Sequence, residues 1–357
     1  MKISRFIQLV PSLVEGDAIS DYARLVRKIC AGRFREAIIL AARRTGRPGL
    51  HEYPISDLGA PGPESLVLYH HSTGDETAET FLSLRGCLRA VYYHNITPPD
   101  LLLEAPDMAA RSHRGLLQLD RLTADVGAWL AASEFSAEDL RCRGARQVQV
   151  VPYGISQDRA RLLAAAAVRR GSAVPQNILF VGRIVPHKAV DDVVRVFALV
   201  QQATGSKCRL TIVGGAGEAS NYSARVQAYA KSVAGDCVDF LGLQTGQHLA
   251  DAFARAGVYL SMSRHEGFGL PLCEAMFAGV PVVAADHGAV REIVGDGGLV
   301  ISDADLAVVA EATQAMIFDP VLRGKILEAQ QLRQTMFTEE ALAARLHAAL
   351  DSIVAGA

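Results

Sequence analysis

Hydrophobic and polar positions alternate along the chain in two patterns. Short apolar runs occupy residues 6–10, 37–41 and 65–69. Longer segments such as 18–31 separate them, and in these segments the apolar residues recur at helical spacing. Strands that are buried on both faces give the first pattern, and amphipathic helices give the second. Their alternation is typical of βα units built on a parallel sheet.

The same alternation continues through the rest of the chain. Further strands are expected at 90–93, 126–131, 147–155, 177–182, 208–215, 238–242, 258–262, 281–285 and 298–301. Further helices are expected at 107–124, 191–202, 221–234, 247–255, 271–278, 305–316, 320–333 and 339–354. Residues 156–176 contain Gly171 and Pro175 and fit a linker. We therefore predict an α/β protein with two doubly wound domains.

The composition limits the class of protein. The chain has 357 residues, of which 50% are hydrophobic and 21% are charged. This length suits two domains, and the apolar fraction excludes a disordered chain. A formal net charge of −2 argues against a protein that coats nucleic acid, because such a protein needs a strong basic surplus.

Cysteine usage and the first apolar run indicate the compartment. The six cysteines are scattered and include no close pair of metal-ligand spacing, so we expect reduced thiols. Gln8 and Pro11 interrupt the first apolar run, and no small-residue cleavage site follows it. A buried strand is therefore favoured over a signal peptide. No apolar run approaches the ~18 residues of a membrane-spanning helix, and we expect a soluble, cytoplasmic protein.

The most informative segment is residues 263–284, with the sequence SRHEGFGLPLCEAMFAGVPVVA. A strand is expected to end at its start, and Gly267 and Gly269 then form a loop into a helix with Pro271 at its first position. The glycines let backbone N–H groups approach a ligand, and the helix N-terminus carries partial positive charge. This predicts an anion site at the carboxyl end of a parallel strand, where open α/β sheets bind ligands.

Two carboxylates and two cations accompany this loop. Glu266 lies in the loop, and Glu274 is expected in the first turn of the helix, where stabilisation of its own helix is the simpler explanation. In residues 180–188, Arg183 and Lys188 follow a strand and offer a planar fork and a point charge to phosphate oxygens. Two exposed loop cations are the alternative. The glycine-rich residues 212–218 resemble a phosphate loop, although a simple turn is the better default.

Taken together, these motifs resemble the retaining nucleotide-sugar glycosyltransferases of family 4, which have the GT-B fold. The resemblance covers residues 177–300, and the two glutamates stand eight positions apart, as in the signature of that family. Shorter matches lie upstream, at 132–136 and 150–155. A further match at 94–99 (HNITPP), together with 69–74, is similar to bacterial transferases that build surface polysaccharides, several of which use mannose.

The resemblance implies a role for each matching residue. Arg183 and Lys188 would hold the donor diphosphate, Glu274 would accept hydrogen bonds from the ribose hydroxyls, and Glu266 would lie beside the donor sugar. His94 would face the sugar near its C6 hydroxyl. The remaining expected donor contacts are Gly16, Gly182, Gly242, Leu243, Gly267, Phe268, Gly269 and Leu270. Gly16 departs from the family, because many members have a Gly-Gly pair where this chain has LVEGDA.

Histidine and acidic patterns bear on catalysis and metals. His94 is followed by an irregular loop, so a ligand contact and a core or capping role are about equally supported. His70 and His71 are adjacent on a strand and point to opposite faces, so at most one reaches a cleft. The sequence has no cluster of His and Cys residues. We expect neither a metal nor a cofactor beyond the nucleotide-sugar substrate.

The resemblance implies a retaining hexosyltransferase with two Rossmann-like domains facing each other across a cleft. Residues 1–165 would bind the acceptor and 166–337 the donor, and a final helix at 338–357 would return to the first domain. The expected reaction moves a hexose, with mannose from GDP-mannose favoured, to a glycan or lipid-linked acceptor in surface polysaccharide or lipopolysaccharide synthesis. An epimerase or phosphorylase of the same fold and a catalytically idle binding module are the alternatives. A dehydrogenase is disfavoured, because the dinucleotide fingerprint is incomplete.

Positive charge is concentrated in one stretch of the expected acceptor domain. Residues 24–47 hold a single acidic residue, Glu36, among eight basic ones: Arg24, Arg27, Lys28, Arg33, Arg35, Arg43, Arg44 and Arg47. We call these eight residues the basic cluster. They would suit peripheral docking on the anionic inner face of the cytoplasmic membrane, and a solvated helix face is the alternative.

Overall fold

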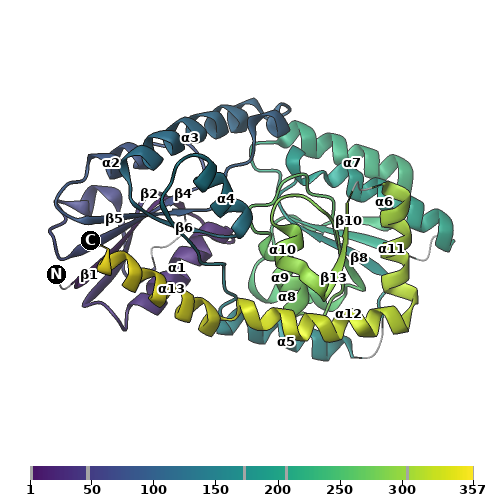
Figure 1. Cartoon of the computed structure of the whole chain (residues 1–357). Helices are drawn as coiled ribbons and strands as arrows, with labels where there is room; N and C mark the ends of the chain where they lie inside the picture. Colours follow the sequence, from purple (N-terminus) through teal and green to yellow (C-terminus); the bar gives the residue numbers. More distant parts are fainter. Residues whose placement is uncertain (1–2, 46–48, 172–173, 206–207, 303–304, 357) are drawn as a thin grey trace. The chain divides into compact units, whose positions relative to one another are not determined.

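The computed structural model describes residues 3–45, 49–171, 174–205, 208–302 and 305–356 (Figure 1). The chain divides into two compact units. The first unit combines Met1–Pro98, Ala110–Gly154 and Glu340–Ala357, and the second combines Pro99–Ala109 with Ile155–Glu339. Each unit holds a parallel sheet with helices, which confirms the predicted class of two doubly wound domains.

The first unit is built on a seven-stranded parallel sheet among its described residues, in the order β3-β2-β1-β4-β5-β6-β7. The strands are β1 (Arg5–Leu13), β2 (Glu36–Arg44), β3 (Glu52–Pro54), β4 (Ser65–His71), β5 (Leu88–Tyr93), β6 (Ala128–Ala131) and β7 (Gln147–Val150). Its helices are α1 (Ala18–Cys30), α2 (Thr77–Ser83), most of α3 (Pro106–Asp125), α4 (Glu134–Cys142) and α13 (Glu339–Ala355), with the short η1 (Ile55–Leu58). The strand order reverses between β1 and β4, so the switch point, where doubly wound sheets bind ligands, lies there.

The second unit has a six-stranded parallel sheet in the part of the chain that the structure describes, in the order β10-β9-β8-β11-β12-β13. The strands are β8 (Asn177–Val181), β9 (Arg209–Val213), β10 (Val238–Phe240), β11 (Val258–Ser261), β12 (Val282–Ala285) and β13 (Gly298–Ile301). Its helices are α5 (Gln157–Arg170), α6 (Val190–Thr204), α7 (Ser220–Ala234), α8 (Gly246–Ala254), α9 (Leu270–Phe277), α10 (Val290–Val294), α11 (Leu306–Phe318) and α12 (Pro320–Arg333). Short 3-10 turns are η2 (Pro99–Leu102), η3 (Pro186–Lys188), η4 (Gly235–Cys237), η5 (Gly295–Gly297) and η6 (Gln334–Phe337). The switch point of this sheet lies between β8 and β11.

The division of the chain differs from the predicted boundary at 165. Helix α5 packs on α8 and α9 and so belongs to the second unit. Arg170 at its end donates to the carbonyl oxygens of Ala278 and Gly279, both at 2.7 Å. Those carbonyls lie just beyond α9 and have no further helical turn to bond them, so Arg170 fixes α5 to this unit.

Residues 99–109 form an arm that leaves the first unit and joins the second. Leu102, Ala105 and Met108 are buried in the hydrophobic core of the second unit, and η2 packs against η3. Glu104 forms an ion pair with Arg225 of α7. Nothing in the spacing of residues 94–110 distinguishes an arm from an ordinary loop, so the sequence did not predict it.

Several short elements escaped prediction, and one predicted strand is shorter than expected. Strand β3 has three residues and helices α2 and α10 have seven and five, so each is too short to show a period. The strand expected at 147–155 ends at Val150. None of the helices among the described residues is both long and apolar enough to cross a membrane.

Candidate functional site

Glycine-rich loops meet at the carboxyl ends of three strands of the second unit. Gly182, which follows β8, donates its N–H to Val213 of β9 at 2.9 Å, and Gly214 donates to Gly242, which follows β10, at 2.8 Å. A Cβ atom at Gly214 would lie 1.9 Å from the carbonyl oxygen of Gly182, and its φ is +144°. Only glycine fits there, so backbone rather than side chain forms this edge of the sheet.

Lys188 and Glu266 come together at the switch point of this sheet. Lys188 ends the η3 turn after β8, and Glu266 lies in the loop after the neighbouring strand β11. The Nζ atom of Lys188 is 2.7 Å from Oε1 of Glu266, and the two side chains are 19% and 11% exposed. The sequence placed both residues in the site, and the structure shows that they form an ion pair.

Arg183 lies on the same loop as Lys188 but is differently placed. It is exposed, and no other described residue forms an ion pair or a side-chain hydrogen bond with it. His187 lies between these cations in the sequence and is buried, with no hydrogen-bond partner for Nδ1 among the described residues. Burial, followed by the charges of Lys188 and Arg183, lowers the pKa of His187, so the turn presents its positive charge through lysine and arginine.

Three contacts that the sequence did not predict position the Glu266 loop. The N–H of Arg264 donates to the carbonyl of His187 at 2.8 Å, and the Arg264 side chain lies 3.1 Å from Asp192 of α6. The N–H of Ala289 donates to the carbonyl of Glu266 at 2.8 Å.

Gly288, beside Ala289, also packs closely against the backbone of Glu266. Its φ is +67°, and a Cβ there would lie 2.3 Å from that same carbonyl oxygen. In the sequence, the only sign that Gly288 approaches Glu266 is that a glycine stands just beyond the end of β12.

Helix α9 differs from its prediction in a way that changes the role of Glu274. The helix begins at Leu270 after Gly269, whose φ is +88°, and Pro271 is its second residue rather than its first. Glu274 therefore lies beyond the first turn, and the expected first-turn placement was wrong. The side chain is buried and forms an ion pair with Arg159 of α5, which no motif indicated.

The remaining predicted donor residues of the second unit vary in exposure. Phe268 is buried and packs edge-on against Phe337, with ring centroids 5.8 Å apart. Leu270 is half-buried. Gly242 (φ +66°) and Leu243 are exposed, Leu243 to 60%. The ring of Phe268 thus serves packing, whereas Leu243 offers an apolar surface to solvent.

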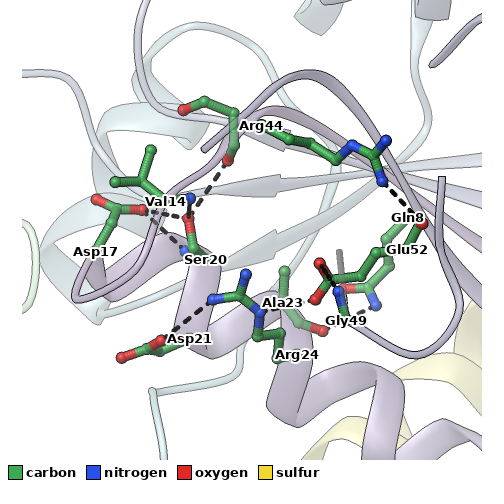
Figure 2. Close-up of polar contacts among 11 residues, drawn as sticks. Gln8, Val14, Asp17, Ser20, Asp21, Ala23, Arg24, Arg44, Gly49 and Glu52 are labelled. Carbon is green, nitrogen blue, oxygen red and sulfur yellow. Dashed lines mark hydrogen bonds and ion pairs between the residues drawn. The ribbon is translucent and has the colours of Figure 1, made fainter. Parts of the chain in front are cut away.

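In the first unit, Gly16 lies in the loop between β1 and α1. It is exposed with a φ of +73°. Asp17 caps α1 by accepting the N–H of Ser20 at 2.9 Å, and the Ser20 hydroxyl accepts the N–H of Val14 at 3.0 Å (Figure 2). These bonds fix both sides of Gly16 and leave its own backbone at the surface.

His94 is buried near the carboxyl end of the first sheet and is fully engaged. Its Nε2 atom lies 2.8 Å from Nδ1 of His70, and its Nδ1 atom contacts the hydroxyl of Tyr153. His70 also contacts Oε1 of Gln8 at 2.8 Å. The adjacent His71 has other partners, the Tyr69 hydroxyl and the carbonyl of Gly115, as alternation along β4 requires.

The basic cluster is partly neutralised within the first unit. Figure 2 shows Arg24 and Arg44 converging on Glu52: Arg24 lies 2.8 Å from its carboxylate, and Arg44 donates to its carbonyl at 3.0 Å. Arg33 pairs with Asp351 of α13 at 2.5 Å. Arg35 and Arg43 are exposed, and the described residues offer them no ion-pair partner. Arg47 lies outside the described residues.

Comparison with known proteins finds a family match within the second unit. Residues 175–319 match the model of the family described as "Glycosyl transferases group 1". This part of the chain is similar to the group 1 glycosyltransferases. The Lys188–Glu266 pair and the glycine loops all lie inside the matched segment.

Curated relatives and solved structures extend the comparison. A D-inositol 3-phosphate glycosyltransferase from Acidothermus cellulolyticus is 33% identical over 218 residues, which are 58% of this chain and 48% of the relative. One from Nocardia farcinica is 35% identical over 181 residues, covering 48% and 40%. The chain thus spans about half the length of the curated relatives it matches.

The fold similarity extends over nearly the whole chain. Sucrose-phosphate synthase from Thermosynechococcus elongatus has a TM-score of 0.75 at 19% identity, covering 99% of this chain and 100% of that structure. HepE from Anabaena, solved in complex with UDP-glucose, also has a TM-score of 0.75, at 16% identity and with 98% and 99% coverage. The two doubly wound domains are therefore those of the GT-B fold.

Within the described part of the chain, no group of three or more His, Cys, Asp or Glu side chains is arranged to hold a metal ion. That the protein requires no metal ion remains a prediction.

Proposed function

We propose that the protein is a retaining glycosyltransferase that moves a hexose from a nucleoside diphosphate sugar to a glycan or lipid-linked acceptor. The observation that carries the proposal is the Lys188–Glu266 pair, 2.7 Å apart at the switch point of the second sheet, beside the exposed Arg183. A cation and a carboxylate that meet there, inside the segment that matches the group 1 glycosyltransferases, suit a donor with both phosphates and a sugar.

In this proposal the cations stabilise the leaving group. Arg183 and Lys188 would bind the diphosphate and neutralise the charge that develops as the sugar departs, without a metal. Lys188 would shift from Glu266 towards the phosphates and leave the carboxylate beside the donor sugar. Glu274, paired with Arg159, would accept hydrogen bonds from the ribose hydroxyls.

The other predicted contacts complete the proposed donor site. N–H groups of the Gly267–Gly269 loop and of the backbone beside Leu270 would bind sugar or phosphate, and Gly242 and Leu243 would lie against the base. In the first unit, Gly16 would approach the phosphate and the acceptor, and His94 would face the sugar near its C6 hydroxyl.

The donor base and sugar are the finer part of the proposal. We favour mannose from GDP-mannose, because residues 94–99 and 69–74 resemble transferases of surface polysaccharide synthesis. HepE was solved with UDP-glucose, so that donor is the main competitor. A thermal-shift screen of GDP-mannose, UDP-glucose, ADP-glucose and TDP-glucose separates them, because only a bound ligand stabilises the folded protein.

Transfer assays test the proposal directly. Lys188→Ala and Glu266→Ala should each lower transfer about 100-fold or more while the protein stays folded. Lys231→Ala removes an exposed lysine of α7 and serves as the control. Near-normal turnover in both site variants would reject the assignment. With the donor alone, slow release of nucleoside diphosphate supports a transferase, epimerised sugar indicates an epimerase, and binding without turnover indicates an idle module.

Peripheral membrane contact is a further part of the proposal. Arg35 and Arg43 are exposed, and no ion pair or side-chain hydrogen bond joins them to the described residues, so they would contact anionic lipid. Replacing both with Ser should weaken binding to phosphatidylglycerol vesicles, whereas Arg141→Ser, at an exposed arginine paired with Glu134, should not. Unchanged vesicle binding would reject the docking surface.

A further inference from the structure

A continuous chain of buried hydrogen bonds runs through the first unit from α1 to the carboxyl edge of the sheet. It joins Ala23, Gln8, His70, His94 and Tyr153 in that order. Gln8 and His70 have no solvent exposure, and His94 and Tyr153 are 8% and 6% exposed. Gln8 and His70 lie on β1 and β4, the two strands that flank the switch point.

The backbone carbonyl of Ala23 sets the direction of this chain. A carbonyl oxygen only accepts, so the Gln8 amide must donate to it through Nε2, at 3.0 Å. The Gln8 Oε1 atom therefore faces His70, and His70 must carry its proton on Nε2 to donate to it at 2.8 Å.

The same logic fixes the proton on His94. With its proton on Nε2, His70 can only accept at Nδ1, so His94 must donate from its own Nε2 across 2.8 Å. The Nδ1 atom of His94 is then an acceptor, and the Tyr153 hydroxyl donates to it. While His94 keeps its Nε2 proton, a second proton on His70 would place two donors face to face.

The surroundings of the chain keep both rings uncharged. Tyr22 of α1 stacks on Tyr153 at 4.5 Å, and Tyr92 of β5 lies 4.6 Å from His94. Burial lowers the pKa of His70 to about 3 and holds the pKa of His94 well below its usual value, with smaller effects on His94 from His70 and His71. Both imidazoles are therefore neutral near pH 7.

We propose that Gln8 and His70 are positioning residues that fix His94 as a neutral acceptor at Nδ1 for a hydroxyl group of the sugar substrate. This inference rests on the proposed function. The Tyr153 hydroxyl occupies this acceptor in the structure, so the sugar hydroxyl would replace it there, as an uncharged donor in its place. A phosphate oxygen, which only accepts, has no bond to make there. The first unit thus recognises a sugar through its hydroxyl and not through its charge.

Histidine ring-¹⁵N spectra of the protein test the chain without any assay of activity. Protonated and unprotonated ring nitrogens have distinct ¹⁵N shifts, so each tautomer is read directly. In the unaltered protein, His70 and His94 should both show a proton on Nε2 only. Observation of either ring with its proton on Nδ1 would overturn the proposal.

Two variants then test the direction. Gln8→Leu removes the acceptor that orients His70, so both histidines should become mixtures of tautomers. Tyr153→Phe removes the other end and should leave both tautomers unchanged. Gln118→Leu is the matched control, because Gln118 is equally buried and bonds Asp75 outside the chain. A purely structural role predicts no such asymmetry, and unchanged tautomers in a folded Gln8→Leu would reject the proposal.

Transfer kinetics connect the chain to the substrate. Gln8→Leu should lower kcat/KM about tenfold, the size of one lost hydrogen bond, with Gln118→Leu unchanged. Full transfer despite scrambled tautomers would reject the link to the substrate. If the unaltered protein transfers no sugar from any donor, the proposed function fails, while the spectra still decide whether the chain is directed.

Discussion

The carboxyl edges of the two sheets are built by opposite means. In the second unit, backbone glycines and paired charges form the edge: Gly214 against Gly182, and Lys188 with Glu266. In the first unit, the edge holds uncharged side chains, with His94 at the end of a buried hydrogen-bond chain. A charged edge suits phosphates, and a neutral one suits hydroxyl groups.

Lowering the pH should produce the largest difference in stability between the two units. Burial holds the pKa of His70 at about 3 and of His71 at about 4, and that of His94 well below its usual value, whereas in the second unit burial lowers the pKa of His187. The unfolded chain binds these protons near pH 6.5, so stability is complete above that pH and is lost as the pH falls towards the folded values. Each histidine contributes a slope of about 1.4 kcal/mol per pH unit below about pH 5.5.

Hydrogen exchange between pH 7 and 4.5 measures this difference. Protection of β4 and β5 should fall more steeply with pH than protection of β8 and β9. Equal slopes in the two sheets would show that the first edge is not held neutral.

Removal of one buried charge should have the next largest effect. Glu274→Leu leaves Arg159 without its ion-pair partner and should lower the free energy of unfolding of the second unit by about 3 kcal/mol. The double variant Arg159→Met/Glu274→Leu should recover most of this loss, because no uncompensated charge remains. Urea unfolding measures both, and a double variant as unstable as the single one would show that the loss is of packing.

Two glycine variants separate the free-energy cost of steric crowding at the Glu266 loop from the cost of a left-handed backbone. Gly288→Ala adds a Cβ atom 2.3 Å from the Glu266 carbonyl at a φ of +67° and should cost about 3 kcal/mol. Gly217→Ala, at a φ of +54° with open space around it, should cost about 1 kcal/mol. Equal losses in urea unfolding would mean that the close approach to Glu266 contributes nothing.

The smallest expected effect concerns Ala189, which follows Lys188 with a φ of +46°. Ala189→Gly relieves left-handed strain but adds unfolded-state entropy, so stability should change by less than about 0.5 kcal/mol. Ala228→Gly, within α7, should cost about 1 kcal/mol because it offers no such relief. Matching losses in thermal unfolding would show that the turn after Lys188 stores no strain.

The sequence predicted the frame of the site better than its side-chain partners. The proximity of Lys188 and Glu266 could be predicted from the sheet topology, because residues that follow neighbouring parallel strands lie at the same edge of the sheet. Arg159 and Gly288 carry no motif of their own, and their roles arise only when α5 and the loop after β12 pack against the site. Tyr153 is similar: its contact with His94 joins the segments that follow β7 and β5, and no spacing along the chain encodes it.

The arm of residues 99–109 limits how such proteins can exchange parts. Leu102, Ala105 and Met108 fill the core of the second unit although they stand more than 40 residues before α5 begins. A hybrid that takes only the contiguous half from Ile155 onward would inherit a hole where these side chains belong. The two units therefore cannot be exchanged as contiguous halves of the chain. A functional hybrid of two relatives must take residues 99–109 from the same parent as the second unit.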